Sequence, residues 1–187
     1  MPNLHCSVLG LPLRKSNVDT DQIIPARFCY KPTRSGHGQS LFGDWRQDEK
    51  FVLNDVRYQG AKAIVAGREF GTGSSREYAV WAIKDAGFDY VISANFGDIF
   101  YRNSILNGLL PVRIEESGIY RLWELLEKDP AMSLEIDLCS KKLSAAGLVS
   151  DILISDRDVD RYMSEMSEIE ETLLLIADIE EFEAKNF

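Results

Sequence analysis

The stretch Gly67-Arg-Glu-Phe-Gly-Thr-Gly-Ser-Ser-Arg-Glu-Tyr78 separates an apolar run from a helical pattern. Residues 61–66 before it are apolar apart from Lys62 and bounded by glycines, which is typical of a buried strand. Alanine and aliphatic residues recur at helical spacing over 79–86, and Gly87 follows where a glycine commonly ends a helix. The order of strand, glycine-rich turn and helix therefore predicts half of a parallel α/β unit.

The turn also carries the residue types of an anion-binding site. Ser74 and Glu77 have capping-box spacing, which predicts Ser74 as the N-cap of the helix. Gly71 and Gly73 allow a sharp turn and a close approach of the backbone to a ligand. The unpaired N–H groups of a first helical turn favour an anion, and Arg76 adds a planar donor for a carboxylate. The alternative is an ordinary capped helix without a ligand, and local sequence does not separate the two.

Strand and helix patterns alternate along the rest of the chain. Residues 4–13 form a mostly apolar opening segment, and apolar or alternating runs predict strands over 90–93, 109–114 and 134–138, with shorter candidates at 51–53 and 152–154. Helical spacing predicts helices over 98–106 and 115–128 and again from Asp156, a candidate cap. Residues 140–143 are expected to turn, and 26–44 to form a long loop. The expected class is α/β, with one domain over 1–187 and a helical C-terminal extension over 156–187.

Composition limits the possible functions. The net charge is −9, and residues 111–187 hold the excess, with 8 basic and 19 acidic side chains. An acidic surface argues against nucleic acid as a partner. The sequence contains neither an apolar run of about 18 residues nor a signal-peptide pattern, so we expect a protein of the cytoplasm without a membrane segment.

The cysteines are too far apart in sequence for a metal motif. Cys6, Cys29 and Cys139 form no Cys-x-x-Cys pair, so we expect no metal, zinc ribbon or iron–sulfur cluster in this chain. An odd number of separated cysteines also suits a reducing compartment and excludes a disulfide framework.

Two separated motifs resemble one known family. These are Asn17-Val-Asp-Thr-Asp-Gln-Ile-Ile-Pro-Ala26 and Gly71-Thr-Gly-Ser-Ser-Arg-Glu77, and together they resemble the small subunits of 3-isopropylmalate dehydratases. The similarity continues through Leu41-Phe-Gly-Asp-Trp45 and Asn95-Phe-Gly-Asp-Ile-Phe-Tyr-Arg-Asn103 and covers nearly the whole chain. The resemblance implies the swivelling β/β/α three-layer fold of the aconitase C-terminal domain.

The resemblance also implies a reaction and a partner. Members of this family isomerise 2-isopropylmalate and 3-isopropylmalate by dehydration and rehydration in leucine biosynthesis. A separate large subunit holds a [4Fe–4S] cluster whose open iron helps the substrate hydroxyl to leave. We therefore expect a heterodimer with an iron–sulfur large subunit and a small dicarboxylate substrate, with no cofactor bound by this chain.

Site residues follow from the matching motif positions. Ser74 matches the family's catalytic base, and Arg76 matches the arginine that binds a substrate carboxylate. Ser75 and Gly73 are expected beside them at the substrate. Asp21 matches an acidic residue at the rim of the active site, although its alternative role is a local turn. Arg34 matches a carboxylate-binding arginine of the aconitase-like domain.

Two positions depart from the family pattern. Tyr78 stands where histidine is expected, and Thr72 replaces a common cysteine. Related hydro-lyases that act on homocitrate, citraconate or dimethylmalate share the scaffold and remain alternatives. A non-catalytic module that binds a small anion is the alternative from another class.

Overall fold

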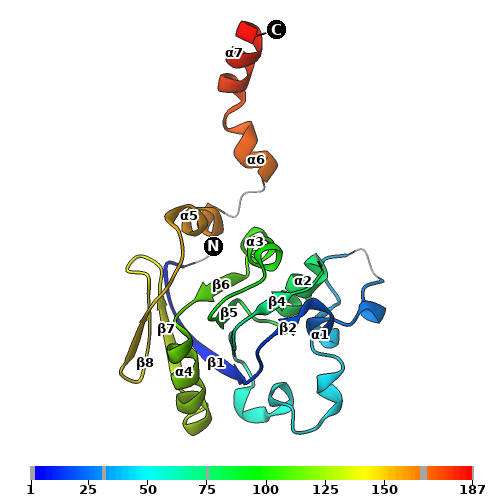
Figure 1. Cartoon of the computed structure of the whole chain (residues 1–187), viewed down its shortest axis with the longest axis vertical. Helices are drawn as coiled ribbons and strands as arrows, with labels where there is room; N and C mark the ends of the chain where they lie inside the picture. Colours follow the sequence, from blue (N-terminus) through cyan, green and yellow to red (C-terminus); the bar gives the residue numbers. More distant parts are fainter. Residues whose placement is uncertain (1–2, 31–32, 75, 165–167, 187) are drawn as a thin grey trace.

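A seven-stranded sheet forms the centre of the molecule in the computed structural model, which describes residues 3–30, 33–74, 76–164 and 168–186 (Figure 1). The strand order is β6-β5-β3-β1-β7-β8-β9. The strands are β1 His5–Leu13, β3 Ala63–Ala66, β5 Tyr90–Ser93, β6 Leu110–Arg113, β7 Ser133–Asp137, β8 Lys142–Ala145 and β9 Leu148–Asp151. β6, β5, β3 and β1 are parallel, whereas β7, β8 and β9 continue the sheet in antiparallel pairing.

Strand β1 belongs to both parts of this sheet. Its second half pairs in parallel with β3, where Gly10 lies opposite Ala63. Its first half pairs in antiparallel register with β7, where Cys6 lies opposite Ile136. The mixed sheet and its crossover helices confirm the α/β class expected from the sequence.

A second, two-stranded sheet brings the two sequence motifs together. β2, Val18–Asp19, pairs in parallel with β4, Phe70–Thr72. The short helix α1, Thr20–Ile23, follows β2 directly. Segments about fifty residues apart therefore lie side by side, next to α1 and α2 (Figure 1).

Helices cover both faces of the large sheet. They are α2 Glu77–Asp85, α3 Asp98–Leu106, α4 Glu116–Lys128 and α5 Asp156–Ser164, whereas α6 Glu168–Leu173 and α7 Ile176–Asn186 lie outside these layers. Because side chains alternate along a strand, Ile64 of β3 lies in the core under α2, and Val65 lies in the core under α4. The buried Trp123 indole of α4 donates a 2.8 Å hydrogen bond to the Val65 carbonyl, which satisfies the ring nitrogen inside the core.

Three local predictions are wrong. Residues 51–53 are not a strand but lead into a 3₁₀ turn over Val52–Asn54. Of the expected turn over 140–143, residues 140 and 141 do turn, whereas residues 142 and 143 belong to β8; a further turn at Ala146 and Gly147, both with positive φ, joins β8 to β9. Residues 152–154 of the expected returning strand lie just after β9.

The expected long loop over 26–44 is anchored to the core. It contains 3₁₀ turns over Ala26–Phe28 and Gly38–Ser40, and Leu41 and Phe42 are fully buried. The Asp85 carboxylate accepts hydrogen bonds from the backbone N–H groups of Gly38 at 2.7 Å and Gly36 at 3.0 Å. These bonds fix the middle of the loop to the end of α2.

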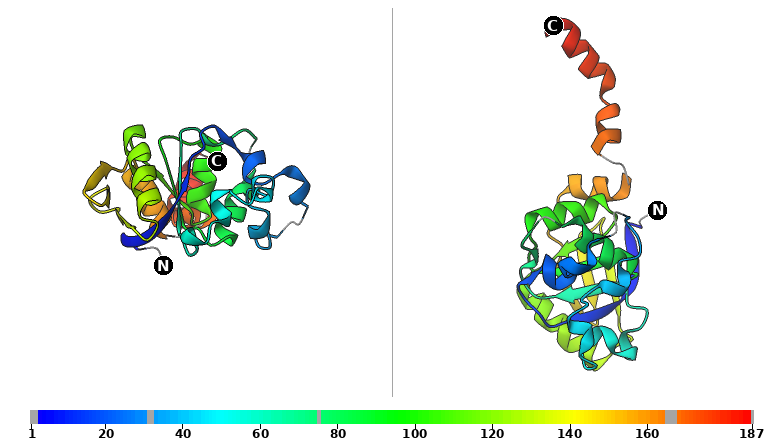
Figure 2. Two further views of the ribbon diagram at one scale, coloured as in Figure 1. Left: turned by 90° about the horizontal axis from the view of Figure 1, so that it is seen from below. Right: turned by 90° about the vertical axis from the view of Figure 1, so that its right-hand side faces the viewer.

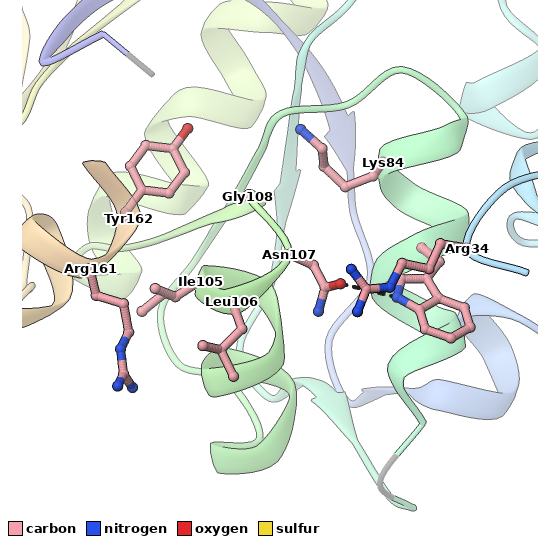
Figure 3. Close-up of a pocket in the computed structure, with 9 residues that line it drawn as sticks. Arg34, Lys84, Ile105, Leu106, Asn107, Gly108, Arg161 and Tyr162 are labelled. Carbon is pink, nitrogen blue, oxygen red and sulfur yellow. Dashed lines mark hydrogen bonds between the residues drawn. The ribbon is translucent and has the colours of Figure 1, made fainter. Parts of the chain in front are cut away.

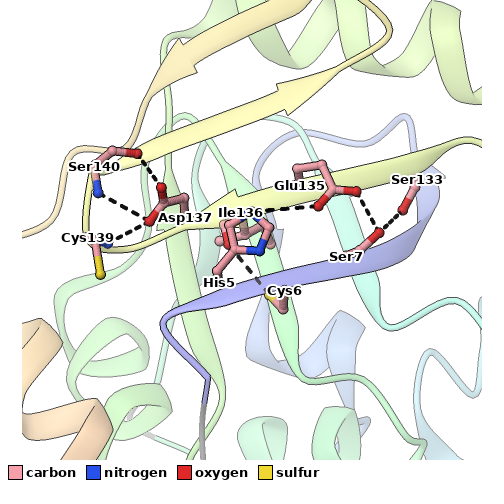
Figure 4. Close-up of polar contacts among 9 residues, drawn as sticks. All are labelled: His5, Cys6, Ser7, Ser133, Glu135, Ile136, Asp137, Cys139 and Ser140. Carbon is pink, nitrogen blue, oxygen red and sulfur yellow. Dashed lines mark hydrogen bonds and ion pairs between the residues drawn. The ribbon is translucent and has the colours of Figure 1, made fainter.

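The outer ends of β1 and β7 carry a polar ladder (Figure 4). The Ser7 hydroxyl donates a 2.6 Å hydrogen bond to the Glu135 carboxylate, and Ser7 also contacts Ser133. Where β7 ends, Asp137 accepts from the Ser140 hydroxyl at 2.7 Å and from nearby backbone N–H groups, which lowers the pKa of Asp137. Such cross-strand contacts and the local turn support the register of this exposed pairing.

The described residues after 155 form the helices α5, α6 and α7, with a turn at 174 and 175 between α6 and α7. Ser155, rather than Asp156, caps α5, because the Asp158 N–H donates to the Ser155 hydroxyl oxygen at 3.1 Å. α5 buries Val159 and Tyr162 against the core under α4. Helices α6 and α7 project away from the body, and their described side chains are exposed apart from the partly buried Ile179 (Figure 2).

The division into one domain with an extension over 156–187 remains a prediction. Within the described ranges, no helix is long and apolar enough to cross a membrane.

Candidate active site

The glycine-rich turn lines an open pocket of about 240 Å³. One side consists of Gly71 to Ser74 with Arg76, and Thr20 of α1 adjoins them. The opposite side is the beginning of α3, from Gly97 to Phe100, together with Asn103. The pocket therefore lies where β4 and α1 meet the N-terminal end of α3, whose unpaired N–H groups favour an anion.

Gly71 is required by the packing at this turn. Its φ is +73°, and a Cβ atom there would lie 2.2 Å from Cγ of the Phe100 ring. Gly73, also at positive φ, lines the pocket with open space around it, since a Cβ there would reach only 3.4 Å from Asp19. Glycine thus permits the turn at Gly71 to pack directly on α3.

Ser74 is held by its backbone and not by its hydroxyl. Its carbonyl accepts a 3.0 Å hydrogen bond from the Thr20 hydroxyl and a 2.8 Å bond from the Arg76 N–H. Among the described residues, the Ser74 hydroxyl has no hydrogen-bond partner, and the residue is exposed in the pocket. The side chain is therefore available to a ligand.

The predicted capping box at Ser74 is wrong. α2 begins at Glu77, its N-cap is Arg76, and no side chain caps it. The Glu77 carboxylate instead accepts a 2.9 Å hydrogen bond from Asn107 of α3. Because Thr20 holds the Ser74 carbonyl, the chain enters α2 in extended form, and the helix begins later than the sequence spacing suggests.

Arg76 forms an ion pair with Asp21 across the pocket rim. Its Nη1 donates to the Asp21 carboxylate, and the Arg76 side chain is 26% exposed against 56% for Asp21. Asp21 is not the local turn residue of the alternative interpretation, since Asp19 makes the capping bond of α1 to the Gln22 N–H. The structure thus brings Asp21 to Arg76, and one guanidinium edge remains for a ligand.

A cysteine lies close to this ion pair. Burial raises the pKa of the Cys29 thiol, Arg76 lowers it and Asp21 raises it. The net effect raises the pKa of the Cys29 thiol, which favours its protonated form.

Arg34 lies in a different pocket (Figure 3). This second pocket, of about 320 Å³, is lined by Arg34 with Trp81 and Lys84 of α2, Asn107 and residues of α5. Arg34 does not line the pocket of Ser74 and Arg76. Its role in substrate binding remains a prediction that requires movement of the loop or a different pose in a complex.

Tyr78 packs away from the pocket. Its ring makes an edge contact with the buried His37 ring at 5.1 Å and lies 4.8 Å from the Trp81 ring. The departure from the expected histidine therefore affects packing between α2 and the loop that carries Arg34. Tyr78 is not among the residues that line the Ser74 pocket.

The structure also adds residues that the sequence did not identify. Thr20, Ile99 and Asn103 line the pocket, and the last two lie one helical turn apart on α3. The segment 95–103 contributed to the family resemblance but carried no assigned role. The resemblance of this segment to the family could be seen in the sequence, whereas its position opposite Ser74 depends on tertiary packing.

Ser75, predicted to bind substrate, lies outside the described residues. In the part of the chain that the structure describes, which includes all three cysteines, no group of three or more His, Cys, Asp or Glu side chains could hold a metal ion.

Comparison with known proteins gives consistent matches. Residues 6–117 match the family model of the aconitase C-terminal domain. The 3-isopropylmalate dehydratase small subunit of Kocuria rhizophila is 48% identical over 179 residues, covering 96% of this chain and 89% of that protein. The protein of the same name from Streptomyces griseus is 49% identical over 175 residues, covering 94% and 89%.

A solved structure agrees with these matches. The crystal structure of 3-isopropylmalate dehydratase from Methanocaldococcus jannaschii is similar with a TM-score of 0.65 and 25% identity, covering 93% of this chain and 99% of that one. The α/β fold of the aconitase C-terminal type, expected from the two motifs, is confirmed. The chain belongs to the family of 3-isopropylmalate dehydratase small subunits.

Proposed function

We propose that this chain is the small subunit of a cytoplasmic 3-isopropylmalate dehydratase, which isomerises 2-isopropylmalate and 3-isopropylmalate in leucine biosynthesis. The observation that carries the proposal is that the unengaged Ser74 hydroxyl and Arg76 line one pocket, where Arg76 is also paired with Asp21. The names of the relatives indicate the substrate, and the Ser74 hydroxyl and the Arg76 guanidinium of the pocket are suited to bind and deprotonate it.

The chemistry explains why these two side chains belong together. Dehydration of a hydroxy diacid needs a base that removes a proton beside a carboxylate, and fixed donors that stabilise the developing charge. Ser74 is the base in this proposal. Arg76 binds a substrate carboxylate with the guanidinium edge that Asp21 leaves open.

A serine hydroxyl is a weak base unless its ionised form is stabilised. Two features favour that form here: the positive charge of Arg76 and the N-terminal end of α3 across the pocket. α2 begins three residues after Ser74, and its first turn adds further N–H donors. In this proposal the Arg76 charge and the helical N–H groups, and not a neighbouring histidine, stabilise the ionised form in which Ser74 acts as the base.

The open pocket suggests that another protein completes the site. The small-subunit names of the relatives imply a large subunit, and we infer that it carries the [4Fe–4S] cluster. The residues of this chain do not fit such a cluster, since Cys6 lies in β1, Cys29 beside Arg76, and Cys139 after β7. Ser74 and Arg76 would then close over a substrate held by the partner.

Reconstitution tests this function. The purified chain is mixed anaerobically with a cluster-bearing 3-isopropylmalate dehydratase large subunit, and turnover of 3-isopropylmalate, homocitrate, citraconate and dimethylmalate is measured. We expect activity on 3-isopropylmalate only in the mixture. Preferred turnover of another acid would assign a related hydro-lyase, and a complex without turnover would support the non-catalytic module.

A variant of Arg76 tests whether this residue binds a substrate carboxylate. Arg76→Lys keeps the charge but loses the planar pair of donors, so we expect it chiefly to raise KM. Arg57→Lys is a matched control, because Arg57 pairs with Asp55 in the same way but outside the pocket. Equal effects of the two changes would remove Arg76 from substrate binding.

A further inference from the structure

Asn103 lies on the wall of the Ser74 pocket that α3 provides. This wall is fixed to the glycine turn, since the Gly97 N–H donates a 2.9 Å hydrogen bond to the Phe70 carbonyl. A Cβ on Gly97 would lie 2.5 Å from the Gly71 carbonyl oxygen, which shows how closely the two segments pack. Asn103 is therefore carried by a helix held in a fixed position relative to Ser74.

The Asn103 amide has no partner in the described structure. Its backbone carbonyl accepts bonds from Asn107, but neither side-chain atom makes a hydrogen bond. Asn107, one turn further along α3, differs in this respect. Its amide accepts from the Trp81 indole at 3.1 Å and donates to Glu77 at 2.9 Å, so it cross-links α2 and α3. The Asn103 amide in α3 therefore makes no hydrogen bond among the described residues, whereas the amide of Asn107, the C-cap of α3, is hydrogen-bonded.

Few of the other side chains that line the pocket offer an N–H donor. The Thr20 hydroxyl donates its proton to the Ser74 carbonyl, and Arg76 is the only cationic side chain among the described lining residues. A dicarboxylate has two anionic groups, and Arg76 accounts for one of them. A second carboxylate in this pocket would meet the unpaired N–H groups at the start of α3, and the Asn103 amide is the side-chain N–H donor on this wall that has no partner among the described residues.

We propose that Asn103 is a substrate-binding residue whose Nδ2 donates a hydrogen bond to an oxygen of the second substrate carboxylate. This inference rests on the proposed function, because it takes a dicarboxylate as the ligand. A neutral amide serves here because it supplies a donor without bringing a further charge into a pocket that also contains Asp98.

Three variants of the reconstituted enzyme test the proposal. Asn103→Ala removes the donor, and we expect KM for 3-isopropylmalate to rise about tenfold, the effect of one hydrogen bond to a charged group. Asn103→Asp keeps the shape but places a carboxylate against a carboxylate, and we expect a rise of about a hundredfold. Both should fold and assemble normally, since the amide makes no internal bond.

Asn107→Ala is the matched control. It should lower the melting temperature, because Trp81 and Glu77 lose their partner, while KM stays near that of the unchanged enzyme. Activity of the unchanged complex on 3-isopropylmalate establishes the proposed function separately. If that activity is present and Asn103→Ala leaves KM unchanged, the inference is wrong although the function stands.

The aspartate variant distinguishes the ligand group. Tolerance of Asn103→Asp together with impairment by Asn103→Ala would mean that the amide accepts from a substrate hydroxyl, which contradicts donation to a carboxylate. Loss of subunit assembly in both variants, measured by size-exclusion chromatography, would place Asn103 in the subunit interface and also overturn the proposal.

Discussion

The Arg76 guanidinium donates to the Asp21 carboxylate, although 55 positions separate the two residues in the sequence. The parallel pairing of β2 with β4 makes this contact possible, because it places α1 beside the glycine turn. Asp21 is the more exposed partner, so the pair is accessible from the pocket rim. The contact orients the arginine that the proposed reaction needs.

Removing the charge of Asp21 should allow the Arg76 side chain to leave the orientation in which it binds substrate. We expect Asp21→Asn to raise KM about tenfold, because the guanidinium loses one charged hydrogen bond that aligns it. Stability should change by less than about 1 kcal/mol, since exposed ion pairs contribute little. Steady-state kinetics of the reconstituted enzyme and chemical denaturation measure the two effects.

Asp19→Asn is the control for Asp21→Asn. It also removes a nearby negative charge, but asparagine caps a helix as well as aspartate does, so α1 should persist. A similar rise in KM for both variants would show that net charge, and not the contact with Arg76, controls substrate binding.

Replacing Gly71 should be far more costly than replacing a glycine in a free turn. Gly71→Ala brings a Cβ into the Phe100 ring at positive φ, and we expect a loss of about 3 kcal/mol or more in the free energy of unfolding. Gly147→Ala also has positive φ but meets no atom within 4 Å, so its loss should be about 1–2 kcal/mol. Equal losses would contradict the close packing of the turn on α3.

The bond between Asp85 and the 36–38 loop should make stability depend on pH. The Gly38 N–H has the largest effect and lowers the pKa of Asp85; burial opposes it, and the Gly36 N–H adds a weaker lowering, so the pKa lies below its ordinary value of 3.8. The stabilisation is therefore complete above pH 3.8 and is lost as the pH falls through the native pKa.

Asp85→Asn removes this contribution. We expect a loss of roughly 1 kcal/mol near neutral pH, limited by the exposure of the side chain. The difference in unfolding free energy between the two proteins should shrink below pH 3.8. A difference that is constant from about pH 6 to about pH 3 would show that the Asp85 charge does not hold the loop.

The sequence predicted the parallel half of the fold well. The run Tyr90–Ser93 and the helix Asp98–Leu106 have the predicted bounds, because buried strands and amphipathic helices follow local hydrophobic spacing. Residues 51–53 look like a strand for the same reason, yet they form a turn since no neighbouring strand pairs with them. Periodicity indicates burial but not the hydrogen-bond partner.

The sequence identified several residues of the site but not how they are arranged in space. The motif identified Ser74, Arg76 and Asp21, and the structure brings them together. The capping prediction failed because Thr20, a residue distant in sequence, holds the Ser74 carbonyl. Asn103 could not be assigned for the same reason, since its position opposite Ser74 depends on how α3 packs against the turn.

Turnover of the assembled Ser74→Ala enzyme tests the central claim most directly. Because the Ser74 hydroxyl has no partner among the described residues and caps no helix, its removal should change the unfolding free energy by less than about 0.5 kcal/mol and leave assembly intact. If Ser74 is the base, kcat should fall by about 10²–10⁴. A folded, assembled Ser74→Ala enzyme with near-normal turnover of 3-isopropylmalate would contradict the account.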